Sequence, residues 1–117
     1  MKRYLSALKY SEMMIGNSSS GTTEGPALKI PVIDIGDRQR GRVFSECAIH
    51  CDPTEKEISY AMRKASTEEF KDVARNAINP FGDGTTSDKM VEILKKLLSR
   101  NISVKKDFFD IQFEAKL

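Results

Sequence analysis

The stretch that decides the fold is MMIGNSSSGTTEGPALKIPVIDIG, residues 13–36. Its first apolar run, residues 13–15, ends in a cluster of small polar residues, which is typical of a short buried parallel strand. Residues 22–28 then have helical character, and residues 31–35 form a second apolar run that a glycine closes. Strand, turn, helix and strand in this order predict a parallel α/β sheet.

The sequence on both sides extends this alternation. Residues 2–12 are expected to form a helix, and residues 47–50 a third short strand. Asp52 followed by proline predicts the N-cap of a further helix, because proline suits the first helical position. A second helix is expected from residue 66 and a third after the turn-forming residues 79–84. This third helix carries the strongest apolar stripe of the sequence, formed by Met90, Ile93, Leu94, Leu97 and Leu98.

Three short strands are few for an open α/β sheet, and the first helix needs strands on which to pack its apolar face. We therefore expect that further strands precede this sequence. Near the other end, Phe109, Ile111 and Phe113 alternate with polar residues, as in a half-buried strand. This pattern predicts a tail that docks on another surface.

Composition excludes several classes of protein. A length of 117 residues suits one small domain, and 19 Lys and Arg against 17 Asp and Glu give a net charge of +2. Nucleic-acid surfaces carry a clustered basic excess, so this balance argues against one. No apolar run approaches the roughly 20 residues of a membrane span. Ser6, Lys9 and Ser11 interrupt the apolar stretch that a signal peptide needs, so the expected compartment is the cytosol.

Cys47 and Cys51 are the only cysteines, and His50 lies beside the second. A structural zinc site normally needs four ligands at recognisable spacings, and the sequence offers no second pair. We therefore expect two reduced cysteines and no metal site.

The turn between the first strand and the following helix has features of an anion site. Ser18 and Ser19 offer hydroxyl donors beside backbone N–H groups, and the glycines on both sides let a phosphate approach closely. Glu24, about one turn into the helix, can accept hydrogen bonds from two vicinal ribose hydroxyls. On the pattern alone, an ordinary serine N-cap with Glu24 serving the helix dipole is the better supported interpretation.

A second anion-compatible loop follows the second strand. Residues 36–42 read GDRQRGR, and the planar guanidinium of arginine suits phosphate recognition. A solvated basic loop is the alternative. Because neighbouring parallel strands end at the same edge of a sheet, both loops are expected to meet at one crevice.

Taken together, these residues resemble the hydrolysing UDP-N-acetylglucosamine 2-epimerases. Order and spacing are shared as well as residue types, which favours the phosphate site over the N-cap for the serines. The sequence departs from the family where Thr22-Thr23 replaces a more apolar pair and where Gly25 replaces the alanine of many relatives. The matching segments are YLSALKYS from Tyr4, GNSSSG from Gly16 with Glu24, PVI from Pro31, GDRQ from Gly36 with Gly41-Arg42, NPFGDG from Asn79 and KKDF from Lys105.

The resemblance implies a glycosyltransferase-B-like fold of two Rossmann-type halves, with this chain at the end of the second half. Residues 1–100 would form part of the nucleotide-sugar-binding domain, and residues 101–117 a tail docking on a missing domain or a partner. By resemblance, Ser18 and Ser19 hold the diphosphate, Glu24 the ribose hydroxyls, and Arg38 makes a further nucleotide contact.

The implied reaction is the conversion of UDP-N-acetylglucosamine to N-acetylmannosamine and UDP, as in sialic acid biosynthesis. It proceeds through elimination to a 2-acetamidoglucal and needs no redox cofactor and no obligatory metal. In the family the proton-transfer groups lie upstream, so we expect no catalytic residue in this chain and no turnover by it alone. His50 is expected to have a structural or surface role.

Three alternatives remain. One is an epimerase of GDP-linked N-acetylglucosamine from a bacterial nonulosonic-acid pathway. Another is a glycosyltransferase of the same fold, for which the arginine loop is a poorer match. The third is a nucleotide-binding fragment without catalysis. The expected partner is a UDP-sugar substrate. The protein is also expected to form a homo-oligomer and to bind neither nucleic acid nor a membrane.

Overall fold

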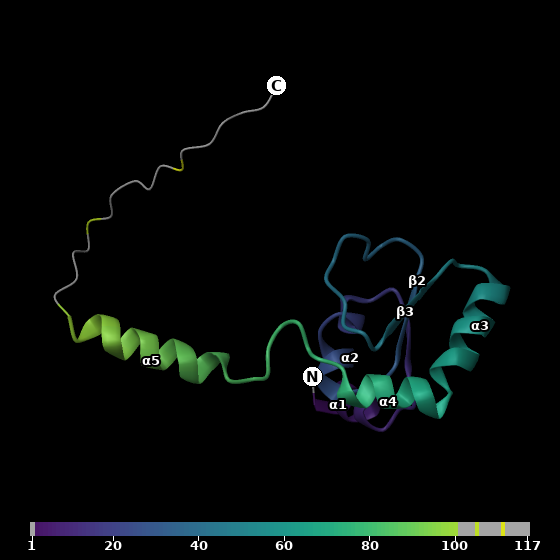
Figure 1. Cartoon of the computed structure of the whole chain (residues 1–117), viewed down its shortest axis with the longest axis horizontal. Helices are drawn as coiled ribbons and strands as arrows, with labels where there is room; N and C mark the ends of the chain where they lie inside the picture. The colour runs from purple at the N-terminus through teal and green to yellow at the C-terminus, as the bar shows by residue number, and fades with distance from the viewer. Residues whose placement is uncertain (1, 101–104, 106–110, 112–117) are drawn as a thin grey trace. The chain divides into compact units, whose positions relative to one another are not determined.

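The computed structural model describes residues 2–100, 105 and 111, which fold into two compact units, one ending at Asp83 and the other beginning at Gly84. The tail expected at residues 101–117 lies outside the described residues, apart from two positions. The elements are α1 (Lys2–Lys9), β1 (Met14–Gly16), the 3-10 turn η1 (Ser19–Gly21), α2 (Glu24–Leu28), β2 (Val32–Ile35), β3 (Ala48–Cys51), α3 (Glu55–Ala65), α4 (Glu68–Asn76) and α5 (Thr86–Leu98) (Figure 1).

The three strands form a parallel sheet in the order β1-β2-β3, which confirms the predicted α/β class. Ile15 of β1 pairs in register with Ile33 of β2. The central strand is buried, with Ile33 at 0% exposure, whereas Ile15 is 42% exposed. The prediction of a buried first strand is therefore wrong for Ile15, because β1 lies at an edge of the described sheet.

The two faces of the sheet pack differently. On one face, Ile33 forms a core with residues of β3, α3 and α4. The other face bears Val32, whose side chain lies where α2 passes: a methyl group on Gly25 would come within 2.4 Å of Cγ2 of Val32. Because Val32 is buried and β-branched, it cannot move aside easily. The close approach of α2 to β2 thus explains why glycine stands at position 25 of this chain.

Two threonines begin the helices that follow the sheet. The side chain of Thr54 accepts a hydrogen bond from the N–H of Glu57 at 3.3 Å, and α3 begins at the next residue. The predicted cap at Asp52 is therefore wrong by two residues, because Thr54 and Glu57 have the spacing of a capping box. Thr67 caps α4 in the same way, as expected for a helix from residue 66.

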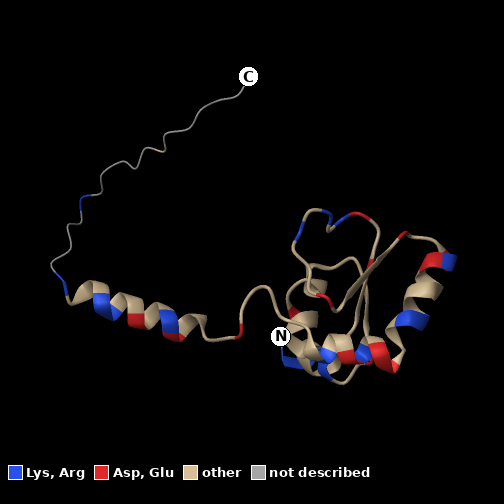
Figure 2. Ribbon diagram, viewed as in Figure 1, with Lys and Arg blue, Asp and Glu red and all other residues tan. Residues whose placement is uncertain are grey.

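The last helix, α5, confirms that the predicted apolar stripe is helical. As far as the described residues show, α5 contains no buried residue, and its large apolar side chains are between 45% and 77% exposed. Basic and acidic residues are mixed along α4 and α5 (Figure 2). No helix in the described part of the chain is long and apolar enough to cross a membrane.

Candidate functional site

The turn of residues 16–21, called here the serine turn, contacts the loop of residues 36–42, called the arginine loop. The backbone carbonyl of Asn17 accepts two hydrogen bonds, one from Nη1 of Arg38 at 3.2 Å and one from Nε2 of Gln39 at 2.7 Å. The two loops follow β1 and β2, which are neighbours in the sheet. The two anion-compatible loops therefore lie together at the carboxyl ends of the strands, where they were expected to meet.

Gln39 links the arginine loop to the serine turn through a buried side chain. It is only 3% exposed, and its Oε1 is buried without a hydrogen-bond partner in the described part of the molecule. Since the Asn17 carbonyl can only accept, the amide nitrogen of Gln39 must face it and the oxygen must point elsewhere. Sequence reasoning assigned Gln39 no role of its own, although it lies within the motif that carries the family resemblance.

The serine turn contains the N-cap of a 3-10 turn and also has hydrogen-bond donors at its surface. Ser18 Oγ accepts from the N–H of Ser20 at 3.3 Å and so begins the 3-10 turn. The Ser19 carbonyl accepts a hydrogen bond from the hydroxyl of Thr22 at 2.7 Å, and this bond stabilises the turn. No hydrogen bond among the described residues uses the backbone N–H of Ser18 or Ser19. Both N–H groups are therefore available to an anion, together with the exposed hydroxyls.

Glu24 begins α2 and is half-buried at the surface. One of its carboxylate oxygens, Oε2, accepts a hydrogen bond from the hydroxyl of Thr23. The helix it begins has only five residues, so its dipole is too small to account for an anion site by itself. Any binding strength at this turn must come from hydroxyl, N–H and guanidinium groups.

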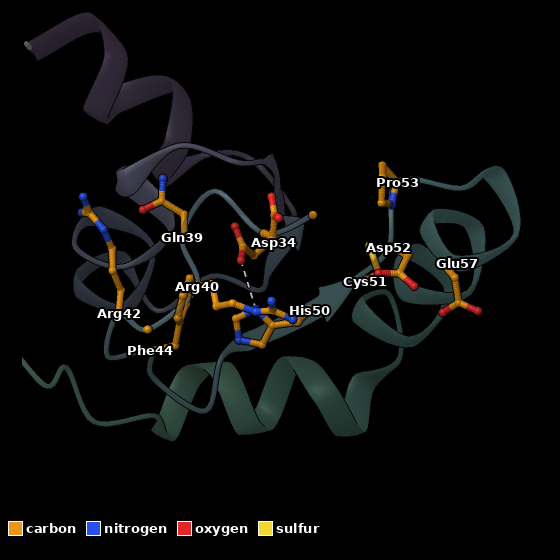
Figure 3. Close-up of a pocket in the computed structure, with 13 residues that line it drawn as sticks. Asp34, Gln39, Arg40, Arg42, Phe44, His50, Cys51, Asp52, Pro53 and Glu57 are labelled. Carbon is orange, nitrogen blue, oxygen red and sulfur yellow. Dashed lines mark hydrogen bonds and ion pairs between the residues drawn. The ribbon is translucent and has the colours of Figure 1, made fainter.

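Beside the joined loops lies a hollow of about 840 Å³, formed by β2, β3, the arginine loop and the start of α3 (Figure 3). Gln39 and Arg42 lie toward one end of it, and Asp52 and Glu57 toward the other. None of the four predicted site residues lines this hollow: Ser18, Ser19, Glu24 and Arg38 all lie outside its lining. The two sequence neighbours of Arg38, Asp37 and Gln39, do line it. The side chains that line it and matter below are Asp34, Gln39, Arg40, Arg42, Phe44 and His50.

A carboxylate and an imidazole pair at the centre of the hollow. Asp34 is 3% exposed, and its Oδ2 lies 3.0 Å from Nδ1 of His50, which is exposed. The ring of Phe44 meets the imidazole edge-on, with centroids 4.4 Å apart and an interplanar angle of 87°. His50 has the surface position expected of it, but its partner was missed. A lone aspartate inside the apolar run of β2 was the available signal.

The cysteines do not form a reactive or metal-binding centre. Burial raises the pKa of the Cys47 thiol. Burial also raises the pKa of the Cys51 thiol, and the carboxylates of Glu57, Asp34 and Asp52 add to that effect. Both thiols therefore stay protonated near neutral pH and are poor nucleophiles and ligands. In the part of the chain that the structure describes, no three His, Cys, Asp or Glu residues gather where they could bind a metal ion.

The amino-acid sequence is similar to those of known proteins. Residues 1–95 match the protein family described as UDP-N-acetylglucosamine 2-epimerase. The chain is 37% identical over 108 residues to the polysialic acid biosynthesis protein P7 of Escherichia coli. It is 36% identical over 110 residues to the GDP/UDP-N,N'-diacetylbacillosamine 2-epimerase (hydrolyzing) of Campylobacter jejuni. It is 33% identical over 109 residues to the UDP-N-acetylglucosamine 2-epimerase of Neisseria meningitidis.

These alignments cover nearly all of this chain, 92%, 94% and 92% in the same order. They cover only 28% of each relative. The chain thus spans little more than a quarter of the length of the proteins that it matches.

Proposed function

We propose that this chain, which belongs to the UDP-N-acetylglucosamine 2-epimerase family, binds the UDP portion of a nucleotide-sugar substrate. Ser18 and Ser19 contact the diphosphate, Glu24 accepts from the ribose hydroxyls, and Arg38 makes a charge-assisted contact on the nucleotide side. The observation that carries the proposal is the double hydrogen bond to the Asn17 carbonyl. It places the arginine loop directly against the serine turn.

The reaction proposed for the whole enzyme is hydrolytic. A proton leaves C2 of the sugar and the bond between C1 and the diphosphate oxygen breaks, which gives UDP and a 2-acetamidoglucal. Water then adds across the double bond and yields N-acetylmannosamine. In the elimination, negative charge develops on the departing diphosphate, and preformed donors aimed at that charge lower the barrier. This chain contributes those donors, whereas the proton-transfer groups lie outside it.

Arg38 can bind a phosphate without leaving its present place. Its guanidinium has five N–H donors. The contacts to the Asn17 carbonyl and, at 3.5 Å, to the Asn17 side chain both use Nη1. The side chain is exposed, so its remaining donors face solvent. Arginine is well suited to this task because its planar donor set matches phosphate oxygens.

Replacing Arg38 with alanine should weaken binding of UDP to the chain by about 10- to 100-fold, because hydrogen bonds to charged groups contribute roughly 1.5–3 kcal/mol. Isothermal titration calorimetry measures this directly. Arg63→Ala is the matched control, because this substitution also removes one positive charge and Arg63 lies on the exposed surface of α3. Arg40 is unsuitable as a control because it lines the hollow. Equal affinities for Arg38→Ala and wild type would contradict the assignment.

Glu24→Gln should reduce UDP affinity while leaving the melting temperature close to that of wild type. The amide keeps the shape of the side chain but replaces one acceptor oxygen with a donor, which cannot accept from a ribose hydroxyl. Differential scanning fluorimetry gives the stability, and calorimetry gives the affinity for UDP and for 2'-deoxy-UDP. A large drop in melting temperature with unchanged UDP affinity would assign Glu24 to the helix instead.

GDP-linked substrates are the second candidate, because the Campylobacter jejuni relative is named for both GDP and UDP sugars. The proposed contacts reach the diphosphate and ribose, which the two nucleotides share. Parallel titrations of UDP and GDP decide between them, since tighter binding of GDP would reverse the assignment of the base.

A further inference from the structure

The imidazole of His50 is fixed in orientation although it is exposed. Its Nδ1 lies 3.0 Å from the buried Asp34 carboxylate, which can only accept, so Nδ1 carries the proton that is donated. Phe44 packs edge-on against the same ring. An exposed side chain normally keeps its rotamer freedom, and ordering it costs free energy. Two fixing contacts leave the other ring nitrogen, Nε2, directed away from Asp34.

His50 also lies on the same side of the sheet as the serine turn. Asp34 and Val32 are two residues apart on β2 and therefore share a face, and Asp34 pairs in register with His50. This is the face on which α2 approaches Val32. Phe44 connects the two regions: its Cε1 atom is 4.0 Å from the point that a Cβ on Gly21 would occupy. The hollow and the serine turn are thus parts of one surface.

We propose that His50 is a further ligand-contacting residue, whose Nε2–H donates a hydrogen bond to a phosphate oxygen of the bound nucleotide sugar. The inference rests on the proposed function and names an additional contact in the same site. In the protonated ring, Asp34 accepts from Nδ1 and balances the positive charge, while Nε2 faces the ligand. Asp34 is then a positioning residue, because it acts through His50 without touching the ligand.

The hollow is lined by both positive and negative side chains. Arg40 and Arg42 belong to the arginine loop, on the side of the hollow toward Gln39, whereas Asp52 and Glu57 lie at the opposite end (Figure 3). The titratable and charged groups that line the hollow with His50 are Asp34, Asp37, Arg40, Arg42, Cys51, Asp52 and Glu57.

The competing explanation is a purely structural pair, in which His50 serves only to satisfy the buried carboxylate. A buried carboxylate without a partner is costly, so such a pair would stabilise the fold. The two explanations differ in their effect on binding. A structural pair makes the affinity for ligand independent of the protonation of His50, whereas a phosphate contact makes the affinity rise when the ring is protonated.

The test uses His50→Asn and UDP-N-acetylglucosamine. Asparagine can still donate to Asp34 from the position of Nδ1 but has nothing at the position of Nε2. In UDP-N-acetylglucosamine the diphosphate is esterified at both ends, so its own charge does not change between about pH 5.5 and about pH 8. Calorimetry at about pH 5.5 and about pH 8 compares wild type with the variant, and the melting temperature is recorded at both.

Wild type should bind about five- to tenfold more tightly at the lower pH, and His50→Asn should bind equally at both, near the wild-type value at the higher pH. Equal pH dependence in both proteins would overturn the role of His50 while leaving the proposed function intact. A lower melting temperature of the variant with unchanged affinities would assign the pair to the fold alone. Absence of binding by wild type at both pH values would overturn the proposed function, and this inference with it.

Discussion

Incubated alone with UDP-N-acetylglucosamine, the chain is expected to release no N-acetylmannosamine above the buffer control. It matches only 28% of each of three relatives, and the proposed proton-transfer groups lie outside it. Elimination requires a base placed against C2 of the sugar, and a displacement of even ~1 Å can cost on the order of 100-fold in rate. Chromatography of the sugar and a coupled assay for released UDP measure the two products.

The UDP-N-acetylglucosamine 2-epimerase of Neisseria meningitidis is the positive control under the same conditions. Calorimetry with UDP in the same preparation shows that the chain is folded and competent to bind. Binding without turnover is the expected combination. Turnover that Ser18→Ala abolishes would show that the chain holds a complete active site, and our division of the reaction would then be wrong.

Ile33→Ala should lower the free energy of unfolding of the sheet-containing unit by about 2–5 kcal/mol. Ile33 is fully buried on the central strand, and the alanine leaves a cavity between the sheet and α3. Typical domains are stable by only about 5–15 kcal/mol, so this loss takes a large share of the total. Urea denaturation followed by circular dichroism gives the midpoint and slope for both proteins.

Ile15→Ala is the matched control because Ile15 pairs with Ile33 in register on the neighbouring strand. Ile15 is 42% exposed, so its substitution removes less buried apolar area. The loss in free energy of unfolding should be less than about half of the loss for Ile33→Ala. Equal losses for the two variants would mean that β1 is covered in solution.

Local patterns were enough to predict most of the fold. The apolar run before Gly36 predicted the central strand because a buried parallel strand needs a continuous apolar sequence. Helical spacing likewise predicted α3, α4 and α5 close to their observed bounds. The cap at Thr54 was missed because an aspartate followed by proline is an equally good local signal. The exposure of Ile15 was missed because it depends on whether a further strand lies beside β1.

The phosphate-binding assignments of Ser18, Ser19, Glu24 and Arg38 came from family resemblance, and they stay predictions. The structure adds the contacts of Arg38 and Gln39 with Asn17, which lies 21 and 22 residues before them in the sequence. These contacts join the arginine loop to the serine turn. Such a contact has no local signature. It follows from two strands lying side by side in one sheet.

By itself, the sequence determined the order of strands and helices and the presence of two anion-compatible loops, because both depend on periodicity and turn residues that act over a few positions. Only the tertiary structure decided which distant side chains meet. Asp34 and His50 form a pair because β2 and β3 run parallel in one particular register, and a shift of one residue would place the two side chains on opposite faces. Gln39 is buried because its loop folds back over Asn17. Pairings of this kind depend on register and packing between distant segments, which short-range patterns do not encode.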